Sequence, residues 1–166
     1  SFSTTGITVG YSKQLRWPDF YTQLGFSLNY TQYHLHNYQI VYTGDFASFR
    51  NGNSNDINLR ISLSRNNLNS AQYPTSGSNV SAFAQLTPPY SLMGYKDATS
   101  PDPSKKYKYI EYQKYRFTGD WYVPIGPPHG DDHKQFVFRV AVKMGYVGKY
   151  NSNPDVTLSP FQRFQL

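Results

Sequence analysis

The chain has 166 residues, a formal net charge of +6 and no cysteine, which excludes disulfide bonds and thiolate metal sites. Aromatic residues make up 17% of it and charged residues only 16%, against about 25% in an average soluble domain. No run approaches the roughly 18 apolar residues that a membrane-spanning helix needs, so the sequence is not that of a helical membrane protein.

Alternation of apolar and polar residues with a period of two, the pattern of a β-strand, predicts six strands and no helix. The first two are expected near Thr4–Tyr11 and Thr22–Tyr33. The third and fourth lie between Asn55 and Leu86, on either side of a polar turn. The fifth is expected near Tyr107–Val123 and the sixth near Gln135–Val147.

Each predicted strand has an apolar and a polar face, and the two faces carry different side chains. The residues expected on the apolar faces are Leu24, Phe26, Leu28, Ile57, Leu59, Ile61, Leu63, Val80, Ala82, Ala84, Leu86, Phe136, Phe138, Val140 and Val142. The polar faces carry the basic residues Arg60, Arg116, Arg139 and Lys143. A basic residue at the midplane of a lipid-facing wall would cost about 2–4 kcal/mol, so we expect the apolar faces to meet lipid and the basic residues to face a lumen.

The links between the predicted strands alternate in length. Residues 12–21, 65–79 and 124–134 form shorter links with turn chemistry: Trp-Pro-Asp, Tyr-Pro-Thr-Ser-Gly and Gly-Pro-Pro. Residues 35–56 and 88–106 form longer, polar links. Transmembrane β-barrels place short turns on the periplasmic side and longer loops outside, so the alternation favours this architecture.

Several motifs resemble the barrel domain of the BamA family of outer-membrane β-barrel assembly factors. The turn from Arg65 to Ser78, RNNLNSAQYPTSGS, includes Tyr73, Pro74 and Gly77 and is the strongest match. Further matches, in the order of the family's Bacteroidota variety, are Leu15-Arg16-Trp17-Pro18-Asp19, Thr87-Pro88-Pro89-Tyr90-Ser91, Asp120-Trp121-Tyr122-Val123-Pro124-Ile125 and Ser159-Pro160-Phe161-Gln162-Arg163-Phe164. The last match departs from the family in having Gln162 where a glutamate is usual.

The resemblance implies an all-β fold in which the chain forms strands six to eleven of a sixteen-stranded, antiparallel up-and-down barrel in the bacterial outer membrane. It also implies the start of the long sixth loop, at Pro160, Phe161, Arg163 and Phe164. Six strands alone would leave two bare sheet edges, so residues 1–166 are expected to be part of one larger barrel domain, without its seam strands or periplasmic domains.

By the same resemblance, the function is part of an insertase that assembles β-barrel proteins into the outer membrane. The expected partners are the rest of the barrel, outer-membrane lipid, nascent outer-membrane β-barrel proteins, and accessory lipoproteins or periplasmic subunits. The barrel of a related protein-exporting transporter, and a soluble antiparallel β binding domain, stay open as alternatives, because a half-buried soluble strand also alternates.

Other function classes find little support in the sequence. The positive charge could indicate nucleic-acid binding, but the basic residues are spread over polar faces of separate strands, and no nucleic-acid partner is expected. No catalytic arrangement or cofactor motif is recognisable, so neither an enzyme nor a cofactor is expected. His34 with His36, and the group His129, Asp131, Asp132 and His133, are better explained as surface and turn residues than as metal ligands.

Overall fold

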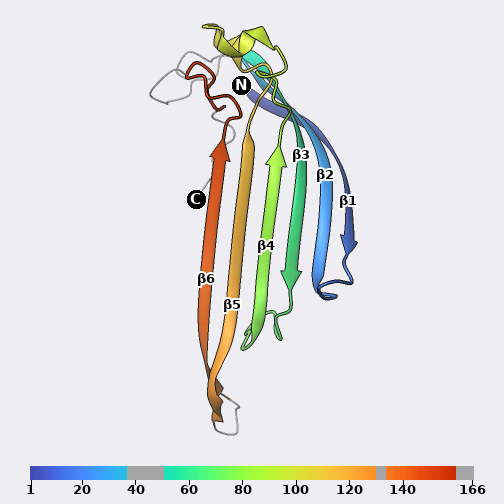
Figure 1. The fold of residues 1–166 in the computed structure, drawn as a ribbon, viewed down its shortest axis with the longest axis vertical. Helices are drawn as coiled ribbons and strands as arrows, with labels where there is room; N and C mark the ends of the chain where they lie inside the picture. The colour runs from blue at the N-terminus through green and yellow to red at the C-terminus, as the bar shows by residue number, and fades with distance from the viewer. Residues whose placement is uncertain (37–50, 130–133, 160–166) are drawn as a thin grey trace.

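The computed structural model describes residues 1–36, 51–129 and 134–159, and in them six strands form one antiparallel sheet (Figure 1). The strands are β1 (Phe2–Gln14), β2 (Thr22–Leu35), β3 (Gly52–Asn66), β4 (Gly77–Leu86), β5 (Gln113–His129) and β6 (Lys134–Gly148). Each strand pairs with its neighbour in sequence, so the spatial order is β1-β2-β3-β4-β5-β6. The predicted all-β, up-and-down fold is confirmed.

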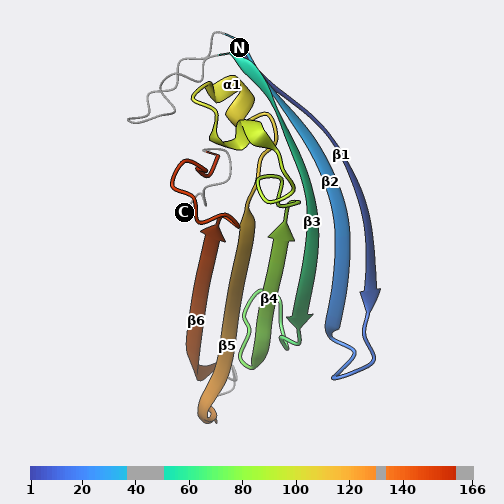
Figure 2. The ribbon, with the colours of Figure 1, turned by 45° about the horizontal axis from the view of Figure 1, so that its top comes forward.

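Short and long links lie at opposite ends of this sheet. Residues 15–21 and 67–76 connect strands at one end, named the turn end here, and the pairing of His129 with Lys134 puts the link between β5 and β6 at the same end. The long link 87–112 and the facing ends of β2 and β3 lie at the other end, named the loop end (Figures 1 and 2). The alternation expected from the sequence is therefore confirmed for the described residues.

The bounds of β5 differ from the prediction at both of its ends. The strand starts at Gln113 rather than at Tyr107, because the preceding residues form the short helices η2 (Lys96–Thr99) and α1 (Pro103–Lys106) and then cross the loop end. At the turn end β5 runs through the Gly-Pro-Pro segment to His129, where a link had been expected from Pro124. The pairing with β6 becomes irregular there, between Ile125 and His129, which accommodates the prolines.

The ends of the strands are staggered in one direction across the sheet. At the loop end, β1 to β3 extend to the register of Gly52, whereas β4 to β6 stop at the register of Leu59, which is seven residues nearer the turn end along β3. At the turn end β5 and β6 project beyond β3 and β4, as Figure 1 shows. The strands β4 to β6 are thus displaced toward the turn end relative to β1 to β3, and a stagger between strands is what closure into a tilted barrel requires.

The buried hydrophobic residues lie at the loop end and not on the apolar face of the sheet. Among the described residues, the buried hydrophobic side chains are Leu35, Tyr107, Ile110, Tyr112 and Val156. They belong to the end of β2 and to the segments 87–112 and 149–159, which lie together over the loop end in Figure 2 and are named the loop-end cap here. No helix in the described residues is long and apolar enough to cross a membrane.

Candidate functional site: an exposed apolar wall, a turn clamp and a loop-end cap

The apolar face is continuous because the pairing register places apolar residues of neighbouring strands opposite each other. Ile61 of β3 pairs with Phe26 of β2 and with Ala84 of β4. The same alignment places on one face all the residues predicted to be apolar-facing: Leu24, Phe26, Leu28, Ile57, Leu59, Ile61, Leu63, Val80, Ala82, Ala84, Leu86, Phe136, Phe138, Val140 and Val142. β1 extends this face with the side chains of Ile7 and Val9, which pair with Tyr30 and Leu28 of β2.

None of these side chains is buried and many are exposed, which is the reverse of a soluble fold. Leu28 is 57% exposed, Val9 68% and Phe136 80%. In the described residues no second sheet or helix covers this face. An apolar surface of this extent is rare on a soluble monomer and marks a membrane or protein interface.

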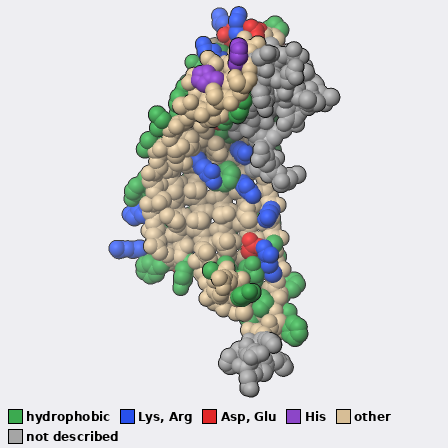
Figure 3. All heavy atoms as spheres, turned by 180° about the vertical axis from the view of Figure 1, so that it is seen from behind, with side chains coloured by type: hydrophobic (Ala, Val, Ile, Leu, Met, Phe, Trp, Pro, Cys, Tyr) green, Lys and Arg blue, Asp and Glu red, His purple; other side chains and the backbone are tan. Residues whose placement is uncertain are grey.

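The opposite face is polar and carries the four predicted basic residues. Arg60, Arg116 and Lys143 alternate in register with the apolar residues and so lie together on this side. The Arg60 guanidinium stacks over the Phe83 ring, 4.0 Å from its centroid. Figure 3 shows this face, with basic side chains gathered over its middle among neutral polar ones.

Arg139 also lies on the polar face, nearer the turn end, and its charge is partly neutralised there. Its guanidinium donates to the Asp120 carboxylate at 2.6 Å and lies over the Tyr122 ring. The pair is half-exposed, so its contribution to stability is small. Because Arg139 is paired with Asp120, the net positive charge of the polar face comes from the other basic residues.

At the turn end, two motifs that are far apart in sequence meet in one hydrogen-bonded cluster. Arg65 at the end of β3 donates to Asp19 at 2.7 Å, to Asn67 at 3.1 Å and to Ser78 at 2.8 Å. Asn67 in turn accepts from the Ser78 amide at 2.8 Å. These four residues are named the turn clamp, because they tie the link 15–21 to the link 67–76.

Asp19 is held in its charged form by the clamp. The hydrogen bond from Arg65 is the main cause that lowers the pKa of the Asp19 carboxyl below its ordinary value, against a smaller opposing effect of desolvation. The carboxylate also accepts from the Thr22 hydroxyl at 2.8 Å and the Tyr21 amide at 3.1 Å. It therefore orders its own turn as well as binding the neighbouring one.

The other motif residues of these turns either set the backbone conformation or present an exposed aromatic side chain. Gly77 has φ of +102°, and a Cβ there would lie 2.3 Å from the Asn67 carbonyl oxygen, so only glycine fits. Trp17, next to Pro18, and Tyr73, next to Pro74, are 84% and 83% exposed. Exposed aromatic side chains at a strand end are typical of the aromatic girdle of a membrane barrel. The predicted motif residues Pro160, Phe161, Arg163 and Phe164 lie outside the described residues.

The loop-end cap is fastened to the polar face by a buried network around one tyrosine. The Tyr112 hydroxyl donates to the Asp56 carboxylate at 3.1 Å and accepts from the Gln85 amide at 2.7 Å. Asn58 donates to Asp56 at 2.9 Å and accepts from Asn29 at 2.8 Å. The network joins residues of β2, β3 and β4 to the segment that precedes β5.

Burial makes this network sensitive to the loss of any member. Tyr112 is fully buried and Asp56 is 3% exposed. Burial, followed by the charge of Asp56, raises the pKa of the Tyr112 phenol, so it is a neutral donor at physiological pH. Sequence analysis missed this network. The available signal was that Asp56 is the one acidic residue in the sequence between Asp45 and Asp97.

Further contacts join the cap to β3 and join the two segments of the cap to each other. The Asn55 amide donates to the Lys108 carbonyl at 2.8 Å and the Ile110 amide donates to the Asn55 carbonyl at 2.9 Å. The Tyr107 hydroxyl contacts the Thr157 hydroxyl at 2.7 Å, which links the two segments of the cap. The cap is thus an ordered lid over the loop end of the polar face.

The residues considered as metal ligands are not brought together in the part of the chain that the structure describes. No group of three or more histidine, cysteine or acidic side chains converges there. His34 Nδ1 contacts the Asn53 side chain at 2.8 Å. Of the second candidate group, residues 131–133 lie outside the described ranges.

A tilted up-and-down sheet with an exposed apolar face, a polar opposite face, and turns and loops at opposite ends defines the class of transmembrane β-barrel proteins. The sequence model of the Omp85 superfamily domain matches residues 1–166, and the chain belongs to this superfamily. A search of the curated proteins found no match. Residues 1–166 are therefore part of the barrel of an outer-membrane insertase or transporter family.

Proposed function

We propose that the chain is a section of the barrel wall of a BamA-type insertase of the Bacteroidota variety, corresponding to strands six to eleven of sixteen. The turn clamp is the observation that carries this proposal. The motifs around Asp19 and Arg65 were each recognised separately in the sequence, and they form one ion pair across two turns. A shared contact gives a physical reason for both motifs to occur together.

In this role the section is structural wall and not the point of substrate entry. Its apolar face meets lipid, and Arg60, Arg116, Arg139 and Lys143 line the lumen. The loop-end cap lies on the outer side. In BamA-like proteins, the periplasmic domains deliver substrates, and an incoming chain pairs with an exposed strand edge at the barrel seam, by β-augmentation. This section supports that seam from the opposite side of the barrel.

The orientation is tested by labelling intact cells. Met93 lies in the cap and is 73% exposed, while Ser70 lies in the link 67–76 and is partly exposed. A membrane-impermeant maleimide should label Met93→Cys in intact cells, and Ser70→Cys only after the outer membrane is permeabilised. Labelling of Ser70→Cys from outside would reverse the orientation.

The structural role is tested by photo-crosslinking in the full-length protein. A photoreactive residue at Val9 in β1 or Val140 in β6 should crosslink to other parts of the same chain or to lipid, but not to nascent outer-membrane proteins. A photoreactive residue in a seam strand is the positive control. Client crosslinks from Val9 as strong as those from the seam would show that this section captures substrates.

The alternative within the superfamily is a protein-exporting transporter, and the basic polar face is compatible with it. The two functions differ in what the cell loses on depletion. Loss of an insertase lowers many unrelated outer-membrane β-barrel proteins together, whereas loss of an exporter removes one or a few secreted proteins. Quantitative proteomics of depleted cells therefore separates them.

A further inference from the structure

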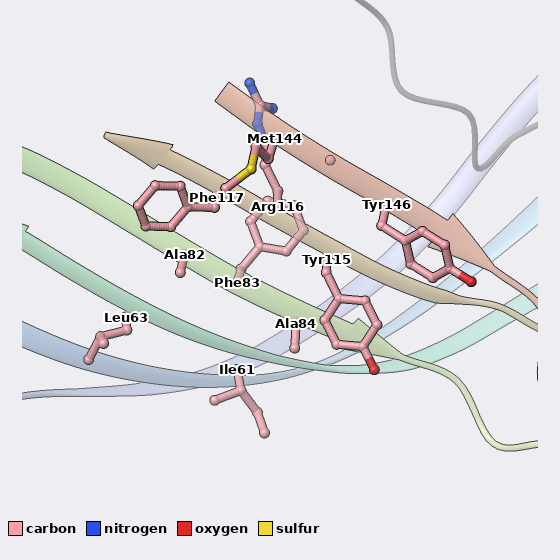
Figure 4. A pocket seen from close by; sticks show the side chains of 11 residues that line it. Ile61, Leu63, Ala82, Phe83, Ala84, Tyr115, Arg116, Phe117, Met144 and Tyr146 are labelled. Carbon is pink, nitrogen blue, oxygen red and sulfur yellow. The ribbon is translucent and has the colours of Figure 1, made fainter. Parts of the chain in front are cut away.

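The apolar face is not flat but has a trough along β4. Its floor is formed by the small side chains of Ala82 and Ala84, and one wall by Ile61 and Leu63 of β3. The other wall consists of larger side chains of β5 and β6, among them Phe117 (Figure 4). The hollow measures about 470 Å³. Because Ala82 and Ala84 succeed each other on one face of one strand, the trough runs along the strand direction.

The two ends of the trough differ in polarity. At its turn-end side the second wall is purely apolar and includes Met144, which pairs with Phe117. At its loop-end side two tyrosine rings, Tyr115 and Tyr146, are stacked with centroids 6.2 Å apart. Both hydroxyl groups point toward the loop end in Figure 4, and the Tyr115 hydroxyl donates to the Gln113 side chain at 3.2 Å.

We propose that this trough binds the upper part of one acyl chain of an outer-leaflet lipid, with the lipid head at the tyrosine end and the first methylene groups of the chain running toward Met144. The elongated apolar floor fits a hydrocarbon chain, and the hydroxyl and amide groups at one end fit the ester and head region of a lipid. The assignment to the outer leaflet rests on the proposed placement of the loop end outside the cell.

A lipid chain fits the trough better than a protein partner does. A stable protein interface has an apolar core surrounded by a polar rim and covers about 800 Å² on each partner. Here the surroundings of the trough are the exposed apolar side chains of neighbouring strands, such as Leu28 and Phe138, which are both 57% exposed. The trough is therefore continuous with the lipid-facing surface of an outer-membrane barrel.

The test uses the full-length protein in nanodiscs made of phosphatidylcholine with a small fraction of photoreactive lipid. One probe carries a diazirine on an acyl chain, close to its ester group, and a second carries it in the head group. Met144 and Val9 are a matched pair of sites, because they lie on the same face and are 60% and 68% exposed. Crosslinked peptides are quantified by mass spectrometry.

A resident chain should give at least five-fold more chain adducts at Met144 than at Val9, and head-group adducts near Tyr146. Filling the trough with Ala82→Leu and Ala84→Leu should reduce the Met144 adducts to the level at Val9, while the control Val140→Leu should leave them unchanged. If the double variant does not fold, the proposal is tested with Ala84→Leu alone. The comparison of adducts at Met144 and Val9 in the unaltered protein tests it as well.

Two results would overturn the proposal. Equal chain adducts at Met144 and Val9 would mean that the trough holds lipid no longer than the rest of the face does. Head-group adducts at Met144 with chain adducts at Tyr146 would mean that the lipid lies in the opposite direction. Both results are independent of whether the protein inserts or exports its clients, which the labelling and depletion experiments decide separately.

Discussion

Replacing Tyr112 by phenylalanine should release the loop-end cap without disturbing the sheet. The hydroxyl bonds to a carboxylate at 3.1 Å and to an amide at 2.7 Å, and both Tyr112 and Asp56 are buried. Hydrogen bonds to charged groups contribute about 1.5–3 kcal/mol, and a buried group that loses its partner costs a similar amount. We therefore expect the cap to lose about 2 kcal/mol of its docking free energy.

Because every 1.4 kcal/mol is a factor of ten, the population of undocked cap should rise about 30-fold. Hydrogen exchange of the full-length protein in nanodiscs measures this, since the amides of Ile110 and Tyr112 are bonded to Asn55 and Thr87 in the docked state. Their protection should fall by that factor, while amides in the middle of β2 and β3 should keep theirs.

Two further tyrosines provide matched controls for this experiment. Tyr107→Phe removes a bond to a neutral hydroxyl, so it should cost about 1 kcal/mol and lower cap protection about five-fold. Tyr73→Phe alters a side chain that is 83% exposed at the other end of the sheet and should change nothing. The reasoning would be refuted if Tyr112→Phe lowered protection no more than Tyr107→Phe does.

Three further outcomes follow from the turns and the two faces, each measured by unfolding of the full-length protein in vesicles. Gly77→Ala should cost at least about 2 kcal/mol, because it adds a clash with a backbone carbonyl to the strain of positive φ, whereas Gly94→Ala, with φ of +94° and open space around it, should cost about 1 kcal/mol. Equal losses of stability in Gly77→Ala and Gly94→Ala would contradict the expected clash at Gly77. The lowered pKa of Asp19 stabilises the fold fully above its unfolded value of about 3.9, and this contribution should vanish as pH falls through the lower folded value. Asp19→Asn should abolish that part of the acid dependence, and an unchanged profile would argue against the clamp. Ile61→Arg should cost up to about 2–4 kcal/mol, according to its depth, and Ser64→Arg on the polar face almost nothing. Similar losses for both would contradict the two-faced wall.

The strands and their faces could be predicted from sequence because a period of two is a local property. The alternation of Ile57 to Leu63 and of Phe136 to Val142 determines which side chains share a face before any pairing is known. The turn around Gly77 was likewise recognisable from its own residues. These parts of the fold therefore agree with the prediction.

The sequence-based prediction was wrong or incomplete where the local alternation of residues and the tertiary structure disagree. Tyr107 and Tyr109 alternate with lysines, as in a strand, but this segment crosses the loop end, where Tyr107 is buried. Nor could the Asp19–Arg65 pair or the Tyr112–Asp56 bond be predicted. The partners are 46 and 56 residues apart, and only the register of the sheet brings them together.

The buried network around Tyr112 makes the cap a check on strand assembly. Its bonds require Asp56 of β3 and Gln85 of β4 to be at one level of the sheet, and a slip of β4 by two residues would keep every apolar side chain on its face yet move Gln85 out of reach. Such a slip would not change the contact with lipid, because the same side chains stay on each face of the sheet. The cap can close only on the correct pairing, so a barrel with misaligned strands would be recognised by an open, rapidly exchanging cap.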